Sequence, residues 1–231
     1  MASTESKTSE FPGMDDDDCL LPADTMLILQ QFLQEKALKE RSDDAGLEAD
    51  GCFEENWQLS QFWYNESTKQ KLALIVKILR ENSMKTEKHF KVALLSAPSA
   101  YKHVYAVHED VILFEYDERF AKYGDKFRKY DYNEACNPEY MEEFRNEFNL
   151  IIADPPFLSE ECIQKIGVII KKIAKQDAKV VLCSGAVVQD WAKEHLDVHV
   201  CNFRPEHERN LGNEFRSYAN FDLDGILNKA S

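Results

Sequence analysis

The sequence predicts an α/β domain built on a doubly wound sheet that is mostly parallel, with an antiparallel strand near the C-terminus. Short apolar runs alternate with longer amphipathic runs after residue 65, which is typical of a parallel sheet covered by helices. The last two apolar runs, 198–204 and 213–221, are separated by only eight residues. Because a parallel crossover needs a longer connection, we expect this pair to be antiparallel.

The first 50 residues differ in composition from the other 181. They contain 13 Asp and Glu against 4 Lys and Arg, whereas the rest contains 29 against 24. Residues 1–20 are predicted to be an acidic disordered tail. Residues 21–50 are predicted to hold one helix and a polar linker, and residues 51–231 to form a single folded domain.

The elements of this domain are predicted in chain order. Asn65 is expected to cap a helix that carries an apolar face at Leu72, Ile75, Val76 and Leu79. Ser99 is expected to cap the helix after the first strand, and Ser159 to begin the helix after the fourth. The seven expected strands are 91–98, 110–117, 127–133, 150–153, 179–185, 198–204 and 213–221.

The most informative strand is Leu150 to Ala153, an apolar run too short for a helix that is followed by Asp154-Pro155-Pro156-Phe157. The two prolines donate no backbone hydrogen bond and have a fixed φ, so the strand must end in a rigid, extended corner. Ligands of open α/β sheets bind at the carboxyl ends of strands. We therefore expect this corner to belong to a functional site.

The corner offers two acceptors to an amino group, the Asp154 carboxylate and the Pro155 carbonyl. Holding the hydrogens of the amine would aim its lone pair at an electrophile, while Phe157 offers an aromatic face to a base or a cation. Asp-Pro-Pro-Phe resembles the motif of methyltransferases that modify amino nitrogens. The simpler interpretation is a strand that ends in a proline turn, with Phe157 in the core.

Candidate cofactor ligands follow the other strands, at Ser96-Ala97-Pro98, Glu115 and Asp131. An acid at the end of the second strand suits the two hydroxyls of a ribose. The first loop has no glycine, which argues against a pyrophosphate cradle but not against S-adenosylmethionine, which has no phosphate. The alternative is that Glu115 and Asp131 are solvated loop acids.

Trp57, Phe62 and Trp63 crowd the segment before the first helix of the domain without a clear period. Such aromatics either form a lid over a ligand pocket or close the edge of the core.

Composition excludes several other functions. The net charge is −14 and the body has no Lys/Arg stripe, so nucleic acid is not the expected partner. No apolar run is long enough for a membrane span. The six cysteines form no CxxC pair and make no ligand spacing with histidine, so we expect free thiols, no metal site and a reducing, intracellular location.

Two long runs carry a family resemblance: Asn-Trp-Gln-Leu-Ser-Gln-Phe-Trp-Tyr (56–64) and Ala-Asp-Pro-Pro-Phe-Leu-Ser-Glu-Glu-Cys (153–162). With 96–99, 114–120, 130–133 and 209–216, they resemble the translation elongation factor 1A lysine methyltransferase family, once labelled N6-adenine methyltransferase-like. The resemblance covers about residues 53–222. It implies a seven-stranded class I methyltransferase fold for residues 51–231, S-adenosylmethionine as donor and a lysine of elongation factor 1A as acceptor.

Three functions are compatible with these patterns: a protein-lysine methyltransferase, an N6-adenine methyltransferase on DNA or RNA, and a non-catalytic binding protein. The adenine enzyme must extract a base from its stack, yet no basic groove is visible. A non-catalytic binding protein would be expected to carry a damaged motif, yet Asp154 to Phe157 is intact. We therefore expect a cytoplasmic, monomeric protein-lysine methyltransferase.

Overall fold

The computed structural model describes residues 53–83, 89–209 and 211–229. From Glu55 onward they form one compact unit. The expected tail (1–20) and the expected helix and linker (21–50) lie outside the described residues.

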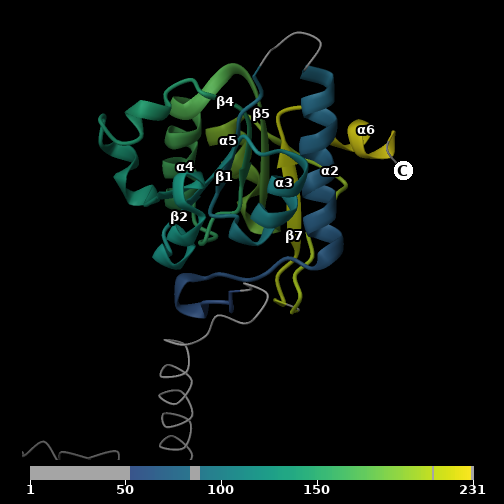
Figure 1. Cartoon of the computed structure of the whole chain (residues 1–231). Coiled ribbons are helices and arrows are strands. Elements are labelled where there is room, and N and C mark those ends of the chain that lie inside the picture. The colour runs from purple at the N-terminus through teal and green to yellow at the C-terminus, as the bar shows by residue number, and fades with distance from the viewer. Residues whose placement is uncertain (1–52, 84–88, 210, 230–231) are drawn as a thin grey trace, which may run out of the picture. The chain divides into compact units, whose positions relative to one another are not determined.

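The described residues contain a seven-stranded sheet in the order β3-β2-β1-β4-β5-β7-β6 (Figure 1). Strands β1 to β5 are parallel, and β7 is antiparallel to both β5 and β6. The predicted seven-stranded, mostly parallel sheet with an antiparallel C-terminal strand is therefore confirmed. The strands are β1 (Val92–Leu95), β2 (Val111–Glu115), β3 (Phe127–Lys129), β4 (Phe148–Ala153), β5 (Ala174–Gly185), β6 (His199–Val200) and β7 (Phe215–Ala219).

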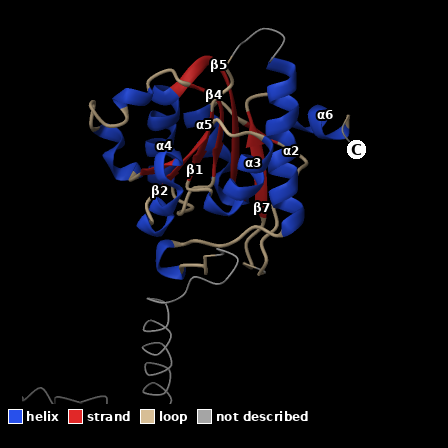
Figure 2. Cartoon of the chain, in the orientation of Figure 1, coloured by secondary structure: helices blue, strands red, loops and turns tan. Residues whose placement is uncertain are grey.

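Helices flank the sheet and alternate with its parallel strands (Figure 2). In the described part of the chain, none of them is long and apolar enough to cross a membrane. The α-helices are α2 (Glu66–Ser83), α3 (Tyr101–Val107), α4 (Glu160–Ile173), α5 (Gln189–Leu196) and α6 (Leu223–Asn228). The 3-10 segments are η1 (Trp57–Leu59), η2 (Pro98–Ala100), η3 (Glu118–Lys126), η4 (Tyr132–Cys136), η5 (Glu142–Phe144) and η6 (Ala186–Val188).

Two of the three predicted helix starts are confirmed. The Asn65 side chain accepts a hydrogen bond from the amide of Thr68 at 2.9 Å, and the Ser159 hydroxyl accepts one from Cys162 at 3.3 Å. The third was wrong, because α3 has Ala100 at its N-cap and no side-chain cap. The hydroxyl of Ser99 instead accepts from the backbone of Tyr64 at 3.5 Å.

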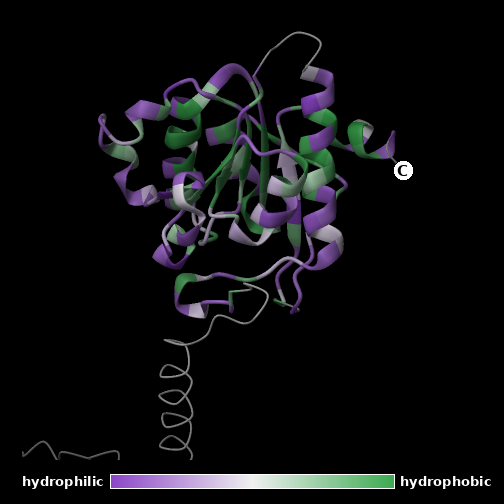
Figure 3. Ribbon diagram, viewed as in Figure 1, coloured by the Kyte–Doolittle hydropathy of each residue, from purple (hydrophilic) through white to green (hydrophobic). Residues whose placement is uncertain are grey.

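Both faces of the sheet are covered. Residues 93, 95, 151, 153, 180 and 182 pack in one buried cluster with the apolar residues of α4 and α5. The alternating residues of these strands, such as Leu94 and Leu150, are also fully buried, so the central strands are buried on both faces. Figure 3 shows apolar strands at the centre and polar outer faces on the helices. Cys162, Cys183 and Cys201 are buried free thiols, as predicted.

The strand order reverses direction between β1 and β4, which are the two central neighbours. Crevices at such a reversal are where open α/β sheets bind ligands, at the carboxyl ends of the strands. Ser96 follows β1 and Asp154 follows β4, and the Asp154 amide donates to the carbonyl of Leu95 at 2.9 Å. The topology therefore brings two predicted site residues to the same edge.

The glycine-free loop after β1 takes a left-handed turn at Ser96, where φ is 52°. A β-branched residue tolerates this conformation poorly, whereas glycine adopts it without strain. We predict that Ser96→Val will have a free energy of unfolding about 1–3 kcal/mol lower than Ser96→Gly. Urea denaturation of both variants measures this difference, and equal stabilities would show that the turn carries no strain.

Candidate active site

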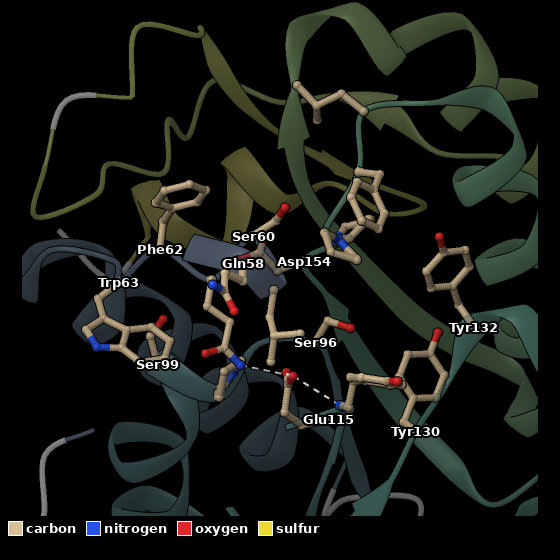
Figure 4. A pocket seen from close by; sticks show the side chains of 18 of the residues that line it. Gln58, Ser60, Phe62, Trp63, Ser96, Ser99, Glu115, Tyr130, Tyr132 and Asp154 are labelled. Atoms are coloured by element: carbon tan, nitrogen blue, oxygen red, sulfur yellow. Dashed lines mark hydrogen bonds between the residues drawn. The ribbon is translucent and has the colours of Figure 1, made fainter. Parts of the chain in front are cut away.

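A cavity of about 380 Å³ opens at the carboxyl ends of β1, β2 and β4, a volume within the usual range for small-molecule sites. Its walls also include residues from the segment before α2, the loop after β3 and the loop before β7 (Figure 4). The cavity therefore combines parts of the chain that are more than 150 residues apart.

The structure brings most of the predicted site residues into this one cavity. The lining includes Ser96, Pro98, Glu115, Asp131, Asp154, Pro155, Pro156, Phe157, Phe62 and Trp63. Two predicted residues are not part of it: Ala97 is fully buried, and Trp57 is 62% exposed beside the ring of Phe62.

The Asp154 corner has the geometry that its prolines impose. Strand β4 ends at Ala153, and Asp154 makes the last ladder bond before the two prolines. Pro155 is buried, whereas Phe157 is 48% exposed and lies 6.2 Å from the ring of Tyr132. The interpretation that placed Phe157 in the core is therefore wrong.

The electrostatics of Asp154 are set by what surrounds it. Burial raises the pKa of its carboxyl to about 8, and the charge of Glu115 adds to the shift. The nearby hydroxyl of Tyr64 acts in the opposite direction. Tyr64 is completely buried, and although its hydroxyl lies close to Asp154, it makes no hydrogen bond of good geometry. Tyr64 ends the aromatic run 56–64, and no local pattern marks it as a neighbour of Asp154.

Glu115 is 4% exposed and uses one of its two oxygens for structure. Its Oε1 accepts from the Gln61 side chain at 3.2 Å and from the amides of Tyr116 and Asp117 at 3.0 and 3.2 Å. Burial raises its pKa, while these three donors lower it. All of these bonds go to Oε1, and Oε2 accepts none from the residues that the structure describes.

Asp131 contributes a third carboxylate to the lining. Its Oδ1 accepts from the amide of Asn133 at 2.8 Å and so begins η4. Part of its role is therefore to hold the loop after β3 against the cavity.

The lining is acidic and aromatic, and none of the described residues in it is a lysine or an arginine. Its single basic candidate is His207, whose pKa is lowered to about 4 by burial, so its ring is neutral at neutral pH. A cavity with carboxylates, aromatic rings and no cation favours a positively charged ligand and disfavours phosphate.

The segment with the crowded aromatics crosses the edge of the sheet where the cavity opens (Figures 1 and 4). Phe62 and Trp63 are half-buried in the wall, and Trp63 meets the ring of Phe120 edge-on at 6.4 Å. These residues therefore cover the cavity and pack on the core at once, which combines the two roles considered from the sequence.

Sequence reasoning missed several lining residues because they come from loops that lie far apart in the chain. They are Gln58, Leu59, Ser60, Gln61, Ser99, Tyr116, Tyr130, Tyr132, Asn133, Leu158, His207, Leu211, Asn213 and Phe215. Most fall inside the runs that carry the family resemblance, which is the signal that marked these loops without assigning roles to their residues.

Comparison with known proteins is consistent with this site. The family model described as "Probable N6-adenine methyltransferase" matches residues 55–223. Protein-lysine N-methyltransferase CG9154 of Drosophila melanogaster is 48% identical over 92% of this chain and 98% of its own. EEF1A lysine methyltransferase 1 of Mus musculus is 42% identical over 90% and 94% of the two chains, and the Homo sapiens protein of that name is 39% identical over the same shares.

Stability should depend on pH through Asp154. Between an ordinary pKa of 3.8 and the folded value of about 8, the unfolded chain loses a proton that the folded chain keeps, so the free energy of unfolding falls as pH rises. Asp154→Asn removes this titration. Because water in the cavity screens the carboxylate, we predict that its stability relative to wild type rises by only about 1–3 kcal/mol from pH 5 to pH 8.

Urea denaturation of both proteins at pH 5 and pH 8 measures this change. A difference that stays constant, or that shrinks toward pH 8, would show that Asp154 does not resist ionisation in the folded state.

Proposed function

This chain belongs to the methyltransferase family described as "Probable N6-adenine methyltransferase", and we propose that it transfers a methyl group from S-adenosylmethionine to a lysine of translation elongation factor 1A. The lysine specificity is supported by the relatives, which are named protein-lysine N-methyltransferase or EEF1A lysine methyltransferase 1. We place the reaction in the cytoplasm, with the enzyme acting as a monomer.

One observation carries this proposal: the Asp154 corner and Glu115 share a cavity whose described lining has three carboxylates and no lysine or arginine. The negative charges of this lining would attract two cations, the sulfonium of the donor and the lysine side chain of the acceptor. A site that gripped a nucleic acid backbone would need the opposite charge.

The residues present fit the donor. Glu115 has one oxygen available for ribose hydroxyls, and the positive φ of Ser96 gives the loop after β1 the turn for which glycine is usually used. Asp131 and the rings of Tyr130 and Tyr132 complete this side of the cavity. When bound, S-adenosylmethionine supplies a methyl group activated by its positively charged sulfur.

The acceptor amine is oriented by Asp154 and the carbonyl of Pro155, while Phe157 presents an exposed ring to its cationic form. A free lysine has a pKa near 10.4 and must lose a proton before it can attack. The pKa of Asp154 is about 8, which is close to the pH at which it would accept a proton from the amine. It is thus a better base than an ordinary aspartate, although orientation remains its main role.

The description of the family names adenine, and the same corner orients an exocyclic amine equally well. The cavity lining weighs against this second candidate, because no described cation in it meets a phosphate. A non-catalytic role would leave the ordered Asp154-Pro155-Pro156 corner without a purpose. Both alternatives are outcomes of the experiments below.

Donor binding tests the role of Glu115. We predict that Glu115→Ala weakens the affinity for S-adenosylmethionine on the order of ten- to a hundred-fold, because hydrogen bonds to a charged acceptor are lost. Titration calorimetry measures this change. Glu118→Ala, an exposed glutamate on the next turn, is the matched control and should bind as wild type does. Equal affinities for all three proteins would remove Glu115 from the site.

Methyl transfer tests the function itself. We predict that the wild type labels purified elongation factor 1A with methyl from S-adenosylmethionine, and labels neither DNA nor RNA. Asp154→Ala should lower the rate by about a hundred-fold, because the amine is no longer oriented, while donor affinity changes little. Labelling of nucleic acid alone would favour the adenine enzyme, and full activity of Asp154→Ala would remove the corner from the mechanism.

A further inference from the structure

The side chain of Gln61 joins the segment that crosses the cavity to the donor side of the site. Its neighbours Phe62 and Trp63 are half-buried, whereas Gln61 is only 7% exposed. A buried amide must be hydrogen-bonded to avoid a substantial desolvation cost. Its partners therefore indicate what Gln61 does.

Both ends of the Gln61 amide have partners. Its Nε2 donates to Glu115 Oε1 at 3.2 Å and to Asp117 Oδ2 at 3.3 Å. Its Oε1 accepts from a guanidinium nitrogen of Arg119 at 3.2 Å, and Arg119 also holds Asp117 at 2.7 Å. A neutral amide, which offers both donors and an acceptor, thus lies between two buried carboxylates and a cation.

We propose that Gln61 is a positioning residue that orients Glu115 for the donor ribose and, through the same amide, couples donor binding to the closing of the 55–64 segment over the cavity. This inference rests on the proposed function, because it takes Glu115 as a ligand of S-adenosylmethionine. In this proposal the 55–64 segment does more than cover the cavity, because its position and the orientation of Glu115 depend on the same amide.

The charges around Glu115 explain why an amide is needed. Burial and the charge of Asp117 on the following turn both oppose its ionisation, and the charge of Glu115 in turn raises the pKa of Asp154 at the end of β4. Tyr130 lies close on the loop after β3, and the cation of Arg119 is engaged by Asp117. With Gln61 removed, only the amides of Tyr116 and Asp117 would hold Oε1. Glu115 would then take up a proton at a higher pH and turn more freely.

The test uses Gln61→Met, which keeps the volume but removes both hydrogen-bonding functions. We expect calorimetry at pH 7.5 to show S-adenosylmethionine binding about five- to thirty-fold weaker than in the wild type. On acidification, its affinity should begin to fall at a higher pH than that of the wild type. A loss of packing alone would lower the affinity without moving this pH dependence.

Gln70→Met is the matched control, since Gln70 also donates from Nε2 to a glutamate oxygen, at 2.7 Å, but on the exposed face of α2. It should bind the donor as the wild type does. Gln61→Glu provides a second variant: its carboxylate should repel Glu115 at pH 8, and affinity should partly return near pH 5.5, where the protonated acid can donate.

The coupling has its own readout in hydrogen exchange. In the wild type, S-adenosylmethionine should slow amide exchange across residues 57–63, and at saturating donor this protection should be largely lost in Gln61→Met. If the wild type itself binds no donor, the proposed function fails. If wild type and Gln61→Met bind with equal affinity and pH dependence and show equal protection, the role given to Gln61 is wrong.

Discussion

The site depends on one backbone constraint, the end of the β4 ladder at Asp154. The Asp154 amide makes the last hydrogen bond to the carbonyl of Leu95, and two prolines then remove the donors that would continue the strand. This places a carboxylate at the point where the strand order reverses, between the ends of β1 and β4. The loops from other parts of the chain build the cavity around that corner.

Desolvation then determines the chemistry that the cavity can perform. Burial raises the pKa of both Asp154 and Glu115, so the charged forms are unstable until a cation or a donor arrives. Backbone amides and Gln61 donate to Glu115, whereas Asp154 faces the imperfectly oriented hydroxyl of Tyr64. The two carboxylates therefore differ in hydrogen-bond support, which favours the ionised form of Glu115 more than that of Asp154.

The departures from expectation have local causes. Serine is a common helix N-cap, but Pro98 already begins a 3-10 turn that includes Ser99. Helix α3 therefore starts at Tyr101, and the Ser99 hydroxyl accepts from the backbone of Tyr64 instead. Phe157 is apolar enough for the core, yet the corner is too rigid to fold it inward. Helix α5 was not predicted because Gln189–Leu196 has few apolar positions, and its burial rests on Ala192 and Leu196.

The sequence by itself determined the periodicity of the strands and helices, the caps at Asn65 and Ser159, and the corner at Asp154, because propensity, capping and proline geometry act over a few neighbouring residues. Only the tertiary structure decided which oxygen of Glu115 is available, how the pKa of Asp154 shifts, and that Tyr64 and Gln61 belong beside these acids. Those properties arise from burial and from contacts across 54 or more residues of chain. No local pattern encodes them, since they depend on how the whole chain folds around the carboxyl ends of its strands.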